Sequence, residues 1–201
     1  MLEFLNSNSG AFNVVANIVM VVIWLSYFHL LLLSFSKQRK SSLVISCTTS
    51  KDDKPECLVA NMSEGQFYVQ NIIGATTVSG QELRADLTEP VSDELEDSLQ
   101  GPMGTGDKLI AGPFRQLLDR LARAHPEADT DAFDKADNID LEITVIGVHG
   151  TDNKSVAAQR TFCLQRKSEG GFQATTVNRT TLQLRHGRKR RDIVTRAANV
   201  R

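Results

Sequence analysis

The chain has 201 residues, with 23 Lys and Arg against 24 Asp and Glu, and 41% of its residues are hydrophobic. This length fits one domain of ordinary size with an appendage, and it excludes large multidomain machinery. The net charge of −1 conceals a split, because residues 36–178 carry −7 whereas residues 179–201 carry +7. No motif in the sequence identifies a reaction.

Residues 11–35 contain no charged side chain and are rich in Val, Ile, Leu, Phe and Met. About 20 such residues cross a hydrocarbon core of ~30 Å as a helix, so we predict a transmembrane helix here, after a short leader of residues 1–10. A cleaved signal peptide is not favoured. The leader carries Glu3 and no basic residue, the apolar stretch is too long, and no small-residue cleavage site follows it.

Basic residues follow the apolar stretch directly, at Lys37, Arg39 and Lys40. Positive charge beside a transmembrane helix marks the cytoplasmic side. We therefore expect a single-pass protein of the inner (plasma) membrane, with the leader outside and everything from residue 36 onward in the cytoplasm.

Polar residues interrupt the predicted span. Asn13 and Asn17 lie one helical turn apart and are candidates for association with other transmembrane helices. The alternative carries more weight: Asn13 lies at the membrane interface, Ser26 bonds back to its own helix, and His29 reaches the headgroups.

Short β-type runs separated by polar or glycine-containing turns dominate the rest of the chain. We predict strands over residues 43–48, 57–61, 66–78, 141–148, 156–165 and 172–177. The turn at residues 150–154 predicts a hairpin between two of them. A β-sandwich over residues 36–178 closes such a set of strands.

One amphipathic helix is predicted to begin at Pro113 and to end before His125 and Pro126. Its apolar residues recur at helical spacing: Phe114, Leu117, Leu118 and Leu121. Two acidic stretches, residues 86–97 and 127–142, are typical of solvated loops.

Cofactor and metal sites are not predicted. Cys47, Cys57 and Cys163 show no zinc-ligand spacing, and an odd number of cysteines implies no disulfide framework in the cytosol. The segment GPMGTGDK resembles a phosphate-binding loop only in part, because Asp107 stands where lysine is needed and no Ser or Thr follows Lys108.

The sequence does not favour catalysis. His149 and Asp152 could be combined with Cys163 or Ser155 as a nucleophilic set, but nothing in the sequence fixes their mutual geometry. The chain is therefore predicted not to be an enzyme, and an enzyme of unknown type that uses His149 and Cys163 stays as a third hypothesis.

The carboxy-terminal residues 179–201 form a basic tail, and five of its bases are the main candidates for binding: Arg185, Arg188, Lys189, Arg190 and Arg191. Polycations bind phosphate groups, and the anionic membrane leaflet is the nearest source of them. The alternative is that the tail neutralises acidic loops of its own domain or of a second copy. Nucleic acid comes third, because no aromatic residues are interleaved with the bases.

The segment LEITVIGVHGTDNKSVAAQRTF, residues 141–162, resembles the cytoplasmic domain of inward-rectifier potassium channels. The likeness extends loosely to residues 36–172, through CLVANM, the strand around Tyr68 and KLIAGPF. It implies an immunoglobulin-like β-sandwich and a lipid-contacting linker at Lys37, Arg39 and Lys40. The pore helix and the selectivity filter of those channels are missing from this sequence, so the resemblance implies no potassium conduction. As a whole, the chain also resembles uncharacterised bacterial single-pass membrane proteins.

The sequence thus predicts a mainly β chain in which an immunoglobulin-like sandwich with one short helix follows a single transmembrane helix. Its expected role is that of a non-catalytic interaction or regulatory module. Its expected partners are membrane lipids and either an unknown protein or further copies of itself. An oligomeric channel-like or ligand-sensing assembly is the alternative.

Overall fold

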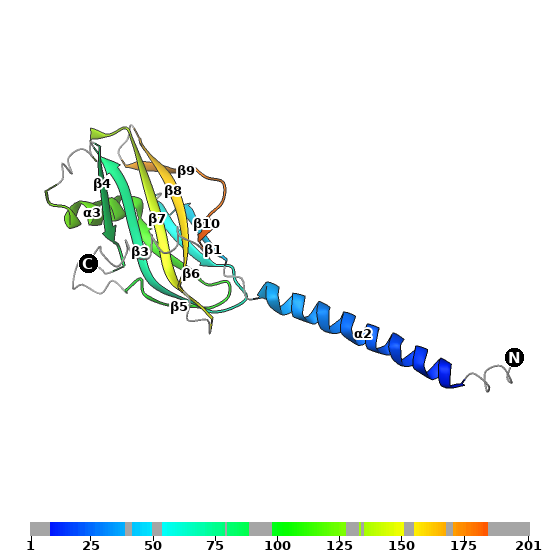
Figure 1. Ribbon diagram of the computed structural model, residues 1–201. Helices are drawn as coiled ribbons and strands as arrows, with labels where there is room; N and C mark the ends of the chain where they lie inside the picture. Colours follow the sequence, from blue (N-terminus) through cyan, green and yellow to red (C-terminus); the bar gives the residue numbers. More distant parts are fainter. Residues whose placement is uncertain are drawn as a thin grey trace. The chain divides into compact units, whose positions relative to one another are not determined.

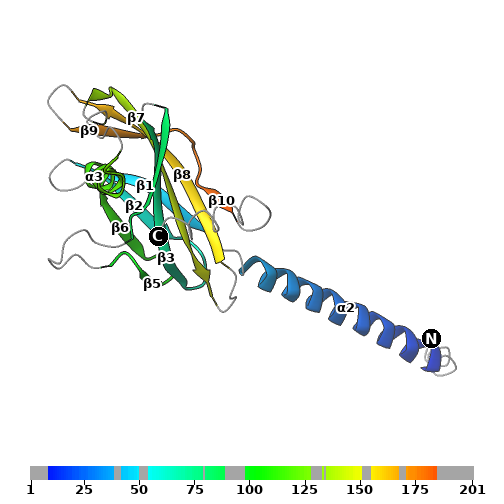
Figure 2. The ribbon, with the colours of Figure 1, turned by 60° about the vertical axis from the view of Figure 1, so that its left-hand side comes forward.

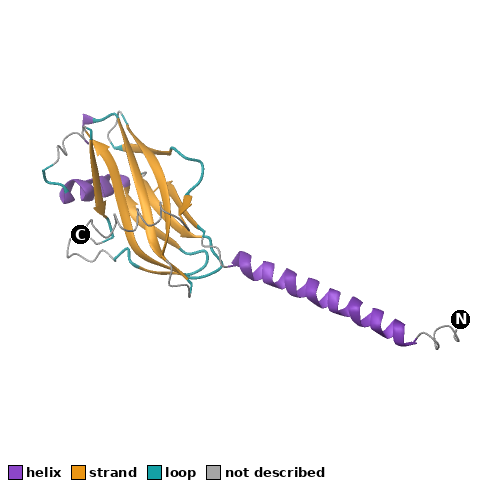
Figure 3. Cartoon of the chain, in the orientation of Figure 1, coloured by secondary structure: helices purple, strands orange, loops and turns teal. Residues whose placement is uncertain are grey.

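The computed structural model describes residues 9–38, 42–49, 54–78, 80–88, 98–127, 133, 135–150, 155–167 and 171–184. Two compact units follow one another along the chain, residues 1–40 and residues 41–201. The first is a helix and the second is mainly strand (Figure 3).

The first unit contains helix α2, Ser9–Gln38. Its stretch Gly10–Ser34 is long and apolar enough to cross a membrane, and its side chains are exposed along the whole stretch. Trp24, for example, keeps 67% of its surface accessible. The hydroxyl of Ser26 donates to the carbonyl of Val22 within the helix, at 2.8 Å. This is the bond that we predicted for Ser26 from the sequence.

The second unit is built from two antiparallel sheets. The small sheet has the order β1-β2-β6, formed by Leu43–Thr49, Pro55–Asn61 and Lys108–Pro113. The large sheet has the order β10-β8-β7-β3-β4, formed by Leu182–Leu184, Ser155–Arg166, Asn138–His149, Phe67–Val78 and Gln81–Asp86. Two further strands join this sheet, β5 (Gly101–Met103) beside β3 and β9 (Phe172–Thr176) beside β8.

Alternation along the strands of the large sheet turns every second side chain towards the core. On β7 the side chains of Leu141, Ile143 and Val145 all point into the main core, as does Phe162 on β8. Figures 1 and 2 show the small sheet and helix α3 (Phe114–Ala124) on the same side of the large sheet. The core therefore lies between two layers.

Two glycines let other groups approach the large sheet closely. A Cβ atom on Gly147 would lie 2.0 Å from the backbone oxygen of Tyr68 on the neighbouring strand. A Cβ atom on Gly74 would lie 2.7 Å from Leu87 and 3.2 Å from Leu121 of α3. A side chain at Gly147 would therefore clash with backbone, whereas one at Gly74 would require Leu87 and Leu121 to move.

Helix α3 packs its apolar stripe into this core, as its spacing predicts. Phe114, Leu117, Leu118 and Leu121 are buried, and the ring of Phe114 lies 4.8 Å from that of Phe162, centroid to centroid. Arg120 is also buried, and its guanidinium donates to the carbonyl of Leu87 at 3.0 Å. Pro113 occupies the N-cap position, one residue before the helix proper.

Side chains, and not a neighbouring strand, form hydrogen bonds with the backbone at the outer edge of β1. Gln183 bonds both the backbone N–H and the carbonyl of Leu43. The hydroxyl of Thr181 accepts from the N–H of Ile45 at 3.0 Å, and Arg160 donates to the carbonyl of Ile45. These contacts tie the small sheet to β8, to β10 and to Thr181 just before β10.

All six strands predicted from the sequence are present, and β7 and β8 form the predicted hairpin. The two acidic stretches are only partly loops, because Asp86 ends β4 and residues 138–142 begin β7; residues 89–97 lie outside the described residues. Strand β10 lies among residues that were expected to belong to the basic tail. The coarse prediction of a mainly β domain behind one apolar helix is confirmed.

Candidate functional site

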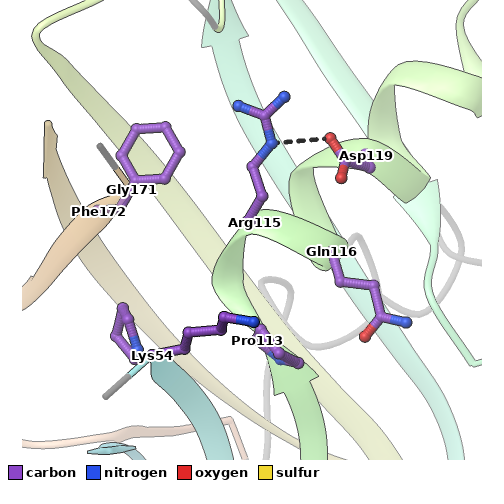
Figure 4. A pocket seen from close by; sticks show the side chains of 8 residues that line it. Lys54, Pro113, Arg115, Gln116, Asp119, Gly171 and Phe172 are labelled. Atoms are coloured by element: carbon purple, nitrogen blue, oxygen red, sulfur yellow. Dashed lines mark ion pairs between the residues drawn. The ribbon is translucent and has the colours of Figure 1, made fainter. Parts of the chain in front are cut away.

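A cleft of about 330 Å³ opens where β2 begins and β6 passes into α3. We call it the α3 cleft, and it is lined by Lys54, Pro55, Pro113, Arg115, Gln116, Asp119, Gly171 and Phe172. Figure 4 shows the side chains of Arg115, Asp119 and Gln116 along one wall, with Phe172 and Lys54 across from them.

The backbone around this cleft is fixed by the turn from β6 into α3. Gly112 adopts a φ of +112°, and a Cβ atom there would lie 2.9 Å from Oε1 of Gln116. Pro113 then sets the chain for the helix. On the opposite wall, the guanidinium of Arg166 lies over the ring of Phe172, 5.2 Å from its centroid.

The electrostatics of the α3 cleft favour a negatively charged group. Lys54 and Arg115 outnumber Asp119, which forms an ion pair with Arg115 at 3.1 Å between Nε and Oδ1. The first turn of α3 contains no acid, and Pro113 provides no side-chain cap. The backbone N–H groups at the N-terminus of α3 add positive electrostatic potential to the cleft. Chemically, the cleft suits a ligand group that combines an apolar body with a carboxylate or phosphate.

A second hollow, of about 450 Å³, lies on the large sheet. We call it the acidic groove, because Glu82, Asp140 and Glu142 line it against a single cation, Arg84. Arg84 contacts both Glu82, at 3.0 Å, and Glu142, at 3.9 Å. Its lining therefore keeps an excess of negative charge.

Asn61 is a buried polar centre that the sequence analysis missed. Its Nδ2 group lies 2.9, 3.1 and 3.0 Å from the carbonyl oxygens of Gly65, Met103 and Gly104. Its Oδ1 accepts from the backbone N–H and the hydroxyl of Ser63. Asn61 thus joins two turns, and an asparagine at the end of an apolar strand, followed by Ser and Gly, was the available signal.

One of those turns is the GPMGTGDK segment. The N–H of Gly104 donates to Oδ2 of Asp107 at 2.6 Å, so the aspartate closes the turn on itself. An acid in this position opposes phosphate. The expectation that the segment is an ordinary turn holds only for its middle, because Gly101–Met103 form β5 and Lys108 begins β6.

The three thiols are held in their protonated form. Burial, with a smaller effect from neighbouring Cys47, raises the pKa of Cys57 to about 12. Burial also raises the pKa of Cys47. Cys163 has its pKa raised by desolvation and by the adjacent carboxylate of Asp140. Protonated thiols are poor nucleophiles and poor metal ligands. Among the residues that the structure describes, no three His, Cys, Asp or Glu side chains gather as a metal site.

The residues of the enzyme hypothesis are not brought together. Cys163 pairs with Asp140 on β7, nine positions before His149, which corresponds to about 30 Å along a strand. Ser155 pairs with Val148, and alternation places its side chain on the sheet face opposite to that of His149. Asp152 lies outside the described residues.

The predicted binding residues fall mostly outside the described part of the chain. This holds for Arg39, Lys40, Arg185, Arg188, Lys189, Arg190 and Arg191. Lys37 lies in the last turn of α2, and its side chain is not described. Asn13 and Asn17 are exposed and lie one turn apart on α2.

No family model, no curated protein and no solved structure matches this chain. The resemblance to the cytoplasmic domain of inward-rectifier channels therefore stays a prediction.

Proposed function

We propose that this protein is a single-pass membrane protein whose two-sheet domain is a cytoplasmic interaction module of the immunoglobulin-like class, without catalytic activity of its own. The observation that carries the proposal is α2, whose stretch of 25 residues is apolar and exposed along its length. Exposed apolar surface on this scale is unfavourable in water and favourable in lipid.

The proposed partner contact is the α3 cleft. Its apolar walls, the cations Lys54 and Arg115 and the N-terminus of α3 favour a protein segment that inserts an apolar side chain next to a carboxylate. Anionic lipid is the proposed contact of Lys37, Arg39 and Lys40, which follow the apolar stretch.

Membrane extraction tests the first half of the proposal. The full chain should stay with the membrane after an alkaline carbonate wash, and deletion of residues 11–35 should release the domain into the soluble fraction. Protease added to inverted inner-membrane vesicles should digest the domain. A protein that is washed off at alkaline pH would contradict the anchor, and digestion restricted to right-side-out cells would reverse the orientation.

Site-specific photo-crosslinking tests the second half. A photoreactive residue at Gln116, inside the cleft, should capture a partner, and Arg115→Glu should reduce the yield. The control probe stands at Met62, which is 61% exposed at the other end of β2. Equal capture from both positions, or capture that Arg115→Glu leaves unchanged, would exclude the cleft.

A second candidate function is an oligomeric channel-like or ligand-sensing assembly. It is favoured by the single face of α2 that carries Asn13 and Asn17. Native mass spectrometry of the full chain, extracted gently together with its lipids, should then show a complex of several copies. Asn13→Leu combined with Asn17→Leu should reduce the number of copies in the complex. A monomer in both lipid and mild detergent would exclude this function.

A further inference from the structure

The face of the large sheet that points away from the main core carries buried apolar side chains at its centre. Ile73, Ile146, Ala157 and Leu184 form a second apolar cluster there, separate from the core. Their exposures are 1%, 3%, 2% and 7%, and Thr144 between them is 1% exposed. A sheet face that meets water leaves such side chains partly exposed. This face is therefore a covered one.

The acidic groove continues the same face. Ile73 and Ala75 stand two positions apart on β3, and Thr144 and Glu142 stand two positions apart on β7, so each pair shares a face. The groove is thus next to the apolar cluster. Leu83, Ala85 and Leu141 point into the core, so alternation turns their neighbours outward. These outward neighbours are the acids Glu82, Asp86, Asp140 and Glu142, with Arg84 among them.

The segment that follows Leu184 is basic and partly apolar, so its composition complements the acidic groove and the apolar cluster. Residues 185–201 contain seven Arg and Lys, one Asp and the apolar residues Ile193, Val194 and Val200. Leu184 is itself a member of the apolar cluster, so the segment leaves the sheet at this face. Crossing from β10 to β4 requires about 19 Å at ~4.8 Å per strand, whereas 17 extended residues reach about 56 Å.

We propose that residues 185–201 dock across the outward face of the large sheet, with their apolar side chains over the Ile73 cluster and their bases along the acidic groove. This inference goes beyond the proposed function, which leaves the contact of the basic tail unassigned. Docking withholds the tail from anionic lipid. The juxtamembrane bases then serve as the lipid contact by themselves.

Cleavage of the tail by an arginine-specific protease tests the proposal in the full chain, held in phosphatidylcholine nanodiscs. Cleavage after Arg188 and Arg196 should be about tenfold slower than in a free peptide of residues 185–201, because the protease acts on the undocked population. Glu82→Lys with Glu142→Lys should abolish this protection. Glu56→Lys with Glu64→Lys makes the same change of charge outside the groove and should leave the protection intact.

Two further variants separate docking from damage to the sheet. Arg190→Glu with Arg191→Glu, added to the Glu82→Lys and Glu142→Lys chain, should restore protection. Arg190→Gln with Arg191→Gln alone alters no sheet residue and should accelerate cleavage after Arg196.

Three results would overturn the proposal: cleavage of the unaltered chain at the rate of the free peptide, no effect of the Arg190→Gln and Arg191→Gln pair, or protection that appears only after phosphatidylglycerol is added and survives the groove substitutions. The last result would assign the tail to lipid.

Discussion

Replacing Asn61 by Ala should remove about 4 kcal/mol from the stability of the β domain. The side chain is fully buried, so its partners cannot turn to water when it is lost. An amide has two N–H groups, which are shared here among three carbonyl oxygens, and its oxygen accepts from two groups of Ser63. Four hydrogen bonds at about 1 kcal/mol each give the estimate, which is a large part of the ~5–15 kcal/mol that holds a typical domain.

Urea unfolding of the full chain in detergent, followed by the strand signal in circular dichroism, measures this loss. Asn71→Ala is the matched control, because among the described residues the Asn71 side chain makes one hydrogen bond, to Asp86 at 2.7 Å; this variant should lose about 1 kcal/mol. Asn61→Asp keeps the acceptor oxygens and loses the donors, so it should be no more stable than Asn61→Ala. An Asn61→Ala chain within error of Asn71→Ala would refute the role of Asn61 as the centre of the two turns.

Two further predictions concern a close approach and a titration. Gly147→Ala should lower stability by at least about 3 kcal/mol in the same urea assay, because its Cβ would lie 2.0 Å from the Tyr68 oxygen; Gly10→Ala, which meets no atom within 4 Å, is the control, and equal midpoints would contradict the packing. Cys57 has its pKa raised by burial from 9.0 to about 12, so the folded state holds a proton that the unfolded state releases. Stability should therefore fall as the pH rises from 9 towards 12, by up to about 1.4 kcal/mol per pH unit, and Cys57→Val should lose this dependence; parallel pH profiles for the two chains would show that the thiol is not the cause.

The strands with strong apolar patterns could be predicted from the sequence. The runs that became β3, β7 and β8 are long and rich in β-branched residues, and the non-alternating pattern from Glu142 to Val148 correctly indicated burial on both faces. The apolar stripe of α3 was equally clear, because Leu117, Leu118 and Leu121 recur at the spacing of one helix face.

The strands that were missed have weak patterns of their own. In β4 the sequence QELRAD contains three charged residues, and its buried Leu83 and Ala85 become meaningful only when β3 lies beside them. Strand β10 has three residues and gains its place by pairing with β8. Local propensity carries little information about such tertiary pairings.

The candidate sites were harder to predict than the fold. The α3 cleft brings Lys54 next to Arg115 and Phe172, which are far apart in the sequence. Only the residues on α3 itself had a recognisable spacing. The acidic groove likewise joins β4 to β7. Asp140 was predicted to lie in a solvated loop and Glu82 was not singled out, because charge alone does not show which face of a strand carries it.

The side chains along β1 have a consequence for the pairing of one copy of the domain with another. An open strand edge can pair with a strand of another molecule. At β1, Gln183, Thr181 and Arg160 already occupy the backbone groups of Leu43 and Ile45. These backbone groups are therefore closed to the strand of a second copy, and a partner that adds a strand to the domain must pair beyond Ile45 or at another border of the sheets.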